Sequence, residues 1–174
     1  GMGMPTTAAY IVQATLVAPA LVKLGADPLA AHMFVFYYAV LGQITPPLAV
    51  AAYAAAPIAG EKASRVGWTA FLIGLPIYIV PFMFVSNTVL LTPEVSVARI
   101  YTLGRSVVAV GALSAVVIGW LFGASLSWLA RGGFILTAVL MVHPGIWTSL
   151  VGVLLLIGVY GLQRRNLHTN GSVT

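Results

Sequence analysis

The feature that most constrains this chain is a run from Leu29 to Gly60 that contains no Asp, Glu, Lys or Arg. As one continuous helix the run would be about 48 Å long at 1.5 Å per residue, whereas the hydrocarbon core of a bilayer is about 30 Å thick. The run therefore either tilts strongly or is broken. Pro46 and Pro47 favour a break, because proline lacks the amide hydrogen that a helix interior needs.

Composition extends this conclusion to the whole chain. Hydrophobic residues make up 60% and charged residues 6%, with Lys+Arg 8 against Asp+Glu 3, whereas a soluble domain carries about 25% charged residues. We therefore expect an all-α polytopic protein in a lipid bilayer. The low charged fraction excludes most soluble enzymes. Nucleic-acid binding is excluded because the scattered cations form no basic stripe, and they are better interpreted as anchors at the membrane faces. Cysteine is absent, which removes disulfides and thiolate chemistry.

Further uncharged runs predict the remaining transmembrane helices. Pro76 and Pro81 predict kinks in the third run. The triplet 143–145, His-Pro-Gly, interrupts the fifth run and leaves two interpretations, a re-entrant turn or a simple span. The runs are Thr7–Val22, Val66–Leu91, Val107–Leu129 and Gly132–Leu162.

The predicted break at Pro46-Pro47 is the strongest functional signal. Without amide hydrogens on the prolines, the carbonyls of Gly42 and Gln43 are expected to lose their helical partners, which is costly in hydrocarbon unless another group binds them. A desolvated cation is such a group, and Thr45 adds a hydroxyl beside it. Broken helices that present carbonyls at mid-membrane coordinate sodium in secondary transporters. The alternative is a packing kink satisfied by neighbouring helices.

A second irregular element, residues 1–7, precedes the first helix. Gly1 and Gly3 permit unusual backbone angles, and Thr6 and Thr7 offer hydroxyls. The element is either part of a cation site or a loop with a helix cap. Gln13 and His32 either line a cavity or are hydrogen-bonded core residues.

No catalytic residue is expected. The acidic residues Asp27, Glu61 and Glu94 all lie between apolar runs, so the sequence offers no carboxylate pair, no Ser/His/Asp set and no metal cluster. We therefore expect a protein that is not an enzyme and that has no cofactor. The sequence does not indicate which residues bind a substrate.

Two motifs in this order resemble a known family. They are Gly-Met-Gly-Met-Pro-Thr-Thr-Ala-Ala-Tyr at residues 1–10 and Gly-Gln-Ile-Thr-Pro-Pro at residues 42–47, followed by an alanine-rich half-helix. Together they resemble the C-terminal part of the large permease subunit of tripartite ATP-independent periplasmic (TRAP) transporters, in particular of fused permeases. The resemblance is good over residues 1–91.

The resemblance implies a fragment of an inverted-repeat transporter. Residues 1–7 would be the tip of a re-entrant hairpin, Thr7–Val22 its returning arm, and Leu29–Gly60 a discontinuous helix that shares a sodium site with the tip. The ion-binding residues would then be Gly1, Gly3, Thr6, Thr7, Gly42, Gln43, Thr45 and Pro46.

The resemblance also implies function and partners. Such permeases couple sodium entry to the uptake of a small, usually anionic organic solute, which a periplasmic binding protein delivers at the bacterial inner membrane. The partners would be that binding protein, the remainder of the permease chain and the lipid bilayer. Residues 1–91 would belong to the permease domain, and residues 92–174 to a C-terminal membrane extension without an inferred role.

Topology and a rival function complete the expectations. If the hairpin tip enters from the periplasm, Lys62 and Arg131 lie inside and Lys23 outside. The positive-inside rule then favours the re-entrant interpretation of residues 143–145, which returns Arg164 and Arg165 to the inside. The rival is a structural or assembly subunit of a membrane complex, with packing kinks and no ion site of its own. It predicts that residues 1–7 and 42–47 lie far apart.

Overall fold

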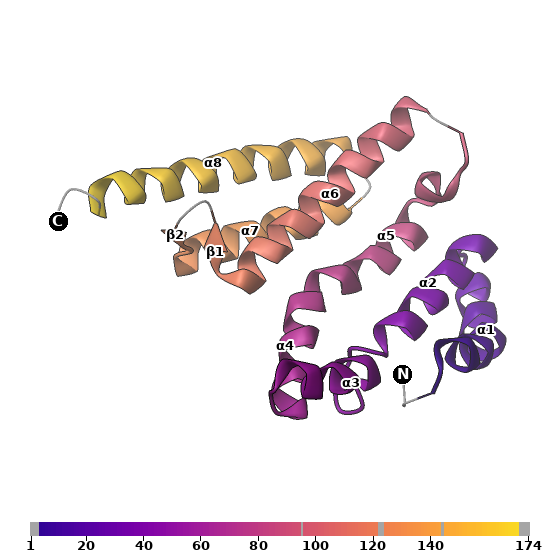
Figure 1. Cartoon of the computed structure of the whole chain (residues 1–174). Coiled ribbons are helices and arrows are strands. Elements are labelled where there is room, and N and C mark those ends of the chain that lie inside the picture. Colours follow the sequence, from indigo (N-terminus) through magenta and orange to yellow (C-terminus); the bar gives the residue numbers. More distant parts are fainter. Residues whose placement is uncertain (1–3, 95, 122–123, 144, 171–174) are drawn as a thin grey trace. The chain divides into compact units, whose positions relative to one another are not determined.

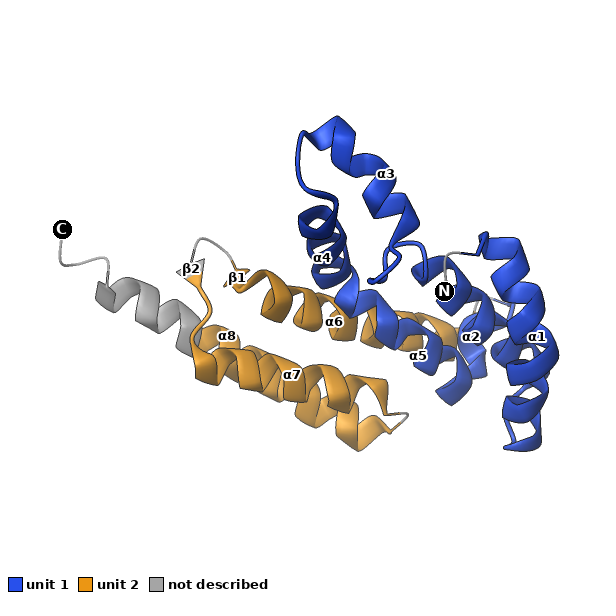
Figure 2. Cartoon of the chain, turned by 90° about the horizontal axis from the view of Figure 1, so that it is seen from below, with its two compact units in different colours: residues 1–95 blue, residues 96–174 orange. Residues whose placement is uncertain are grey.

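The computed structural model describes residues 4–94, 96–121, 124–143 and 145–170, which form helices, short turns and one two-stranded hairpin (Figure 1). By its internal contacts the chain divides into two compact units, residues 1–95 and residues 96–174 (Figure 2). The described residues thus agree with an all-α protein apart from the small hairpin. The assignment of residues 1–91 to a permease domain and 92–174 to an extension stays a prediction.

The first unit begins with a helical hairpin. Helix α1 (Thr6–Lys23) confirms the first predicted run, and a short turn leads into α2 (Pro28–Leu41). Asp27 caps α2, because its Oδ1 accepts hydrogen bonds from the amides of Leu29 at 2.9 Å and Ala30 at 3.1 Å, the usual role of Asp at this position. The two helices pack through buried Ala18, Ala31 and Val35.

The second apolar run is broken, as the prolines predict. After α2 ends at Leu41 the backbone is irregular until α3 (Val50–Ala59) begins. Gly60 then adopts a left-handed conformation with φ of +65° and ends α3, a common helix stop. An exposed ion pair between Glu61 and Arg65, 3.0 Å from Oε2 to Nη1, follows in the turn.

Prolines also interrupt the third run. It consists of α4 (Ala63–Gly74), the 3₁₀ helix η1 (Leu75–Ile79), α5 (Val80–Ser86) and the 3₁₀ helix η2 (Thr88–Leu91). Pro76 and Pro81 lie at the starts of η1 and α5, which confirms the predicted irregularities. Helix α5 packs on α2, where the rings of Phe34 and Phe82 meet edge to face with centroids 5.3 Å apart.

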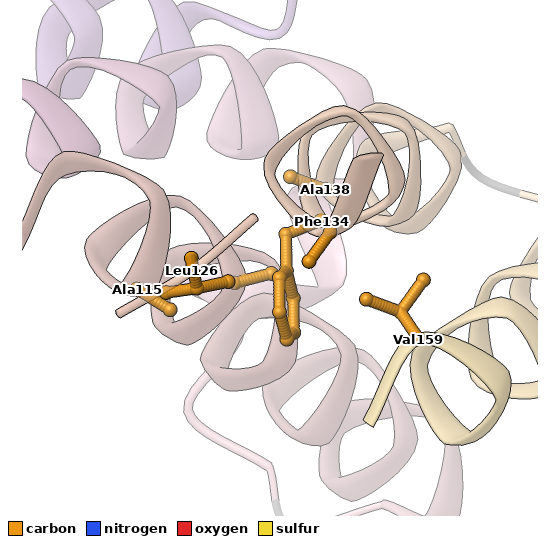
Figure 3. Packing of buried hydrophobic residues seen from close by; sticks show 7 residues of the cluster. Ala115, Leu126, Phe134, Ala138 and Val159 are labelled. Atoms are coloured by element: carbon orange, nitrogen blue, oxygen red, sulfur yellow. The ribbon is translucent and has the colours of Figure 1, made fainter. Parts of the chain in front are cut away.

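The second unit is built from three helices. They are α6 (Val97–Ile118), α7 (Trp128–Val142) and α8 (Ile146–Asn170), and strands β1 (Trp120–Leu121) and β2 (Ala124–Ser125) join α6 to α7. Its core is a cluster around Phe134 (Figure 3), formed with small and aliphatic side chains: Ala112, Ala115, Leu126, Ala130, Ala138 and Val159.

Glycines let α7 and α8 approach closely. A Cβ built on Gly133 would lie 2.4 Å from Cγ2 of Val159, and one on Gly152 would lie 2.8 Å from Cε of Met141. Small residues at such contacts are typical of helices that pack in lipid. The two helices therefore form a tight hairpin, which confirms the interruption of the fifth run near His143. Whether the hairpin is re-entrant stays a prediction.

The expected boundaries of the fourth run, Val107–Leu129, are wrong. Helix α6 starts at Val97, includes both Arg99 and Arg105, and stops at Gly119, whose φ is +70°. The boundaries differ because the long stem of an arginine can pack along a helix in an apolar setting, so Arg99 and Arg105 do not mark a loop. The stop was missed because the residues around Gly119 are themselves apolar.

Apolar helices and exposed apolar side chains fit a membrane protein. Two helical segments, Ala63–Ser86 and Val97–Ile118, are long and apolar enough to cross a bilayer. Large hydrophobic side chains are exposed in the chain alone, among them Ile58 at 91% and Trp128 at 89%. Such surfaces need lipid or other polypeptide to cover them.

Candidate functional site at the break in the second run

The irregular segment between α2 and α3 contacts the start of the chain. The side-chain amide Nε2 of Gln43 donates a hydrogen bond to the carbonyl of Met4 at 3.1 Å. The two elements singled out in the sequence thus meet at this point, against the rival's expectation that they lie far apart. Gly1 and Gly3 lie outside the described residues.

Thr45 is the centre of a hydroxyl network at the break. Its Oγ1 donates a hydrogen bond of 2.6 Å to the carbonyl of Leu41 and so satisfies the last carbonyl of α2. The same oxygen also hydrogen-bonds the hydroxyl of Tyr78 from η1. The hydroxyl of Tyr38 in turn donates to the carbonyl of Tyr78 at 2.9 Å. The breaks in the second and third runs are therefore joined by side-chain hydrogen bonds.

The Gly42 and Gln43 carbonyls lose their helical partners, as expected from the prolines, but backbone amides replace those partners. The amide of Ala51 donates to the Gln43 carbonyl at 3.0 Å, and the amide of Thr45 approaches the Gly42 carbonyl at 3.5 Å. The chain turns back after the prolines, and Ala49 takes up a left-handed conformation with φ of +29°. This turn brings the first residues of α3 to the carbonyl that the prolines leave unpaired.

A cleft of about 440 Å³ lies beside this network. It is bordered by α1, the end of α2, the break and η1. Its lining residues are Met4, Ala9, Val12, Gln13, Val17, Tyr38, Leu41, Gly42, Thr45, Pro46 and Tyr78. None of these lining residues is charged, so their polar atoms are amide groups and hydroxyls.

The predicted site residues divide between two places. Gly42, Thr45 and Pro46 line the cleft, and Gln43 bonds Met4, which also lines it. Thr6 and Thr7 form the first turn of α1, and neither is among the residues that line the cleft. The ion-binding set itself stays a prediction.

Tyr38 and Tyr78 are the polar groups that sequence reasoning missed. Both stand in apolar runs, where a phenol is usually counted as a hydrophobic side chain. The signal for Tyr78 was its place between Pro76 and Pro81, where backbone carbonyls need partners. Of the two polar residues in the runs, Gln13 lines the cleft. His32 is instead hydrogen-bonded through its Nδ1 to the hydroxyl of Tyr10, 3.0 Å away.

Uncharged oxygens from a broken helix and its neighbours suit a cation of low charge. The carboxyl end of α2 carries the negative pole of its helix dipole, and carbonyls at such ends coordinate sodium in some secondary transporters. The second lone pair of a bonded carbonyl remains available for this. Among the described residues there is no group of three or more His, Asp or Glu that would hold a multivalent metal.

One comparison with known proteins identifies a family. The family described as tripartite ATP-independent periplasmic transporter, DctM component, matches residues 1–99. That range contains the whole first unit, with the break and the cleft. No curated protein and no solved structure matches the sequence.

Proposed function

Because this chain belongs to the family of DctM components of tripartite ATP-independent periplasmic transporters, we propose that its first unit contributes to a sodium site of a secondary transporter. The break between α2 and α3, with the hydroxyl of Thr45 and the carbonyl of Gly42, supplies the ligands. Residues 1–7 supply others, with Gly1, Gly3, Thr6 and Thr7 as the candidates.

The observation that carries the proposal is the contact between the two irregular elements. Gln43 joins the break to Met4, and the cleft next to it is bordered by both elements. A desolvated ion needs several oxygens from different segments, and a site built from two segments changes when either moves. This is the requirement for coupling ion binding to a conformational change.

The transported solute is, on this proposal, a small organic anion. A periplasmic binding protein delivers it to the permease, in the inner membrane of a bacterium, and sodium entry drives its uptake. These expectations are supported by the family of the chain. The remainder of the permease would provide the other half of the transport domain.

The test is sodium-dependent uptake by the complete transporter that contains this chain. Thr45→Ala and Pro46→Ala are expected to raise the sodium concentration for half-maximal uptake. For Thr45→Ala we expect a rise of about ten- to a hundredfold, because a hydrogen bond or ligand to a charged group contributes about 1.5–3 kcal/mol. Thr15→Ala is the matched control, because its hydroxyl bonds only carbonyls of its own helix, Ile11 at 3.2 Å and Val12 at 2.9 Å. Unchanged sodium titrations in both site variants would contradict the proposal.

The second candidate is a structural or assembly subunit of a membrane complex. One observation favours it, because the amide of Ala51 already satisfies the Gln43 carbonyl, as a packing kink requires. This candidate predicts that Thr45→Ala lowers the thermal stability of the protein equally with and without sodium. An ion site instead predicts that sodium stabilises the unchanged protein and not the variant.

A further inference from the structure

The direction of the hydrogen bonds at the break follows from counting protons. The Oγ1 atom of Thr45 lies 2.6 Å from the carbonyl oxygen of Leu41, and a carbonyl oxygen can only accept a hydrogen bond. The one proton of the Thr45 hydroxyl is therefore used in that bond. Thr45 also bonds the hydroxyl of Tyr78, and since it has no second proton, Tyr78 is the donor there. The network thus runs from η1 through Thr45 to the end of α2.

The same count shows which acceptor Thr45 keeps. A hydroxyl oxygen has two lone pairs, and one of them accepts the proton of Tyr78. Among the described residues no other group donates to this oxygen. Because Thr45 lines the cleft, its second lone pair is the one that a cation in the cleft can use.

Tyr78 is itself held in place, as a fixed donor requires. It is half-buried, and its backbone carbonyl accepts a hydrogen bond of 2.9 Å from the hydroxyl of Tyr38. Its ring packs against the rings of Tyr38 and Phe71, with centroids 6.0 and 5.7 Å apart. Both the backbone and the ring of Tyr78 are thus restrained, so its hydroxyl can restrain Thr45.

The geometry points to Tyr78 as a positioning residue for the sodium site, an inference that rests on the function proposed above. By donating to Thr45, its hydroxyl occupies one lone pair and keeps the proton of Thr45 on Leu41, away from the cleft. The remaining lone pair is then oriented before the ion arrives. Such preorganisation strengthens binding, because the site does not have to be ordered when the ligand enters. Tyr78 acts in this way through Thr45 and without a contact to the ion.

Two other roles for Tyr78 make different predictions. A phenol that only braces the fold stabilises the protein equally with and without sodium. A phenol whose oxygen binds the ion directly contributes to sodium binding even when the hydroxyl of Thr45 is absent. A positioning residue affects sodium binding, and does so only while Thr45 keeps its hydroxyl.

The test measures uptake by the complete transporter that contains this chain. Tyr78→Phe is expected to raise the sodium concentration for half-maximal uptake by about three- to tenfold, the value of one ordinary hydrogen bond. This rise is smaller than that for Thr45→Ala, because the ligand oxygen itself remains. At saturating sodium, the solute concentration for half-maximal uptake should stay unchanged. An unchanged sodium requirement in Tyr78→Phe would overturn the positioning role.

A double-mutant cycle shows whether Tyr78 acts through Thr45. Added to Thr45→Ala, the substitution Tyr78→Phe should cause no further rise in the sodium requirement. Added to Thr45→Ser, which keeps the hydroxyl, it should again cause a rise of about three- to tenfold. A rise that persists beside Thr45→Ala, or that is absent beside Thr45→Ser, would overturn the inference.

Tyr10→Phe is the matched control. It removes a phenol hydroxyl of the same unit that makes one side-chain hydrogen bond, 3.0 Å long, to His32, and Tyr10 is not among the residues that line the cleft. Its sodium titration should equal that of the unchanged transporter, and a shift as large as that of Tyr78→Phe would overturn the inference.

The same titrations separate this inference from the proposed function. If Thr45→Ala raises the sodium requirement and Tyr78→Phe does not, the sodium site stands and the role of Tyr78 is overturned. If neither variant changes it, the sodium site is contradicted and the role of Tyr78 with it.

Discussion

Hydroxyl groups make most of the side-chain hydrogen bonds at the break, where the cleft lining carries no charged side chain. Thr45 lies in the irregular segment after α2 and bonds both the carbonyl of Leu41 and the hydroxyl of Tyr78, so one small side chain connects the end of α2 to η1. Thr45 was recognisable from sequence because it precedes Pro46-Pro47. Tyr38 and Tyr78 were not, because the position of a phenol oxygen depends on tertiary packing that hydropathy does not describe.

Removal of the Tyr78 hydroxyl tests the network at the level of one atom. Tyr78→Phe keeps the ring contacts with Tyr38 and Phe71, at centroid distances of 6.0 and 5.7 Å, and removes the bond to Thr45. We expect a loss of about 1 kcal/mol in the free energy of unfolding, the usual value for one hydrogen bond. Denaturant titration in detergent measures it, and a stability equal to that of the unchanged chain would show that the bond contributes nothing.

Ala49 provides a prediction of the opposite sign. Its φ of +29° lies in the left-handed region, which costs a residue with a Cβ about 1–2 kcal/mol. Ala49→Gly should therefore stabilise the chain by up to about 1 kcal/mol after the loss of a buried methyl group. A higher thermal midpoint in detergent would agree with this, and a lower one would show that burial of the methyl dominates.

At the scale of elements, the sequence predicted breaks better than boundaries. Pro46-Pro47, Pro76 and Pro81 mark irregular backbone because the missing amide hydrogen acts wherever proline stands. The end of α6 was missed because Gly119 and the strands after it are apolar and carry no proline. Arg105 gave the opposite error, because its charge predicted a loop before Val107 whereas it lies inside α6. Contacts with Tyr101 and Val142, which only the fold provides, accommodate it there.

The contact between α7 and α8 gives a matched pair of variants. Gly133→Ala would place a Cβ 2.4 Å from Val159, and we expect a loss of about 1–3 kcal/mol, typical of overpacking. Gly132→Ala, where nothing lies within 4 Å, should be neutral or stabilising because alanine favours helix. Thermal unfolding in detergent compares them.

A second substitution distinguishes steric conflict from other causes. Val159→Ala removes the methyl groups that a Cβ on Gly133 would meet, so the double variant Gly133→Ala with Val159→Ala should recover part of the lost stability. Costs that simply add would show that Gly133 and Val159 are not in conflict.

At the scale of the whole molecule, the absence of cysteine makes the orientation in the membrane directly measurable. Entry of the hairpin tip from the periplasm predicts that Lys62 and Arg131 lie inside and Lys23 outside. In whole cells, a membrane-impermeant maleimide should label the single variant Ala26→Cys and not Lys62→Cys. The reverse pattern would invert the predicted topology of the first unit.

The orientation of the last helical hairpin is a separate question. A re-entrant hairpin returns Arg164 and Arg165 to the inside, so a reporter fused after Thr174 should report the cytoplasm. A periplasmic reporter signal would show that the fifth run crosses the membrane as a simple span.

The reciprocal use of Tyr38 and Tyr78 has a mechanical consequence. The hydroxyl of Tyr38 donates to a backbone carbonyl of η1, and the hydroxyl of Tyr78 bonds Thr45, which in turn bonds the last carbonyl of α2. Straightening the backbone at Pro46-Pro47 or at Pro76 would therefore break these hydrogen bonds. A movement of one proline break is thus coupled to the other. The two proline breaks, far apart in the sequence, are therefore expected to move together.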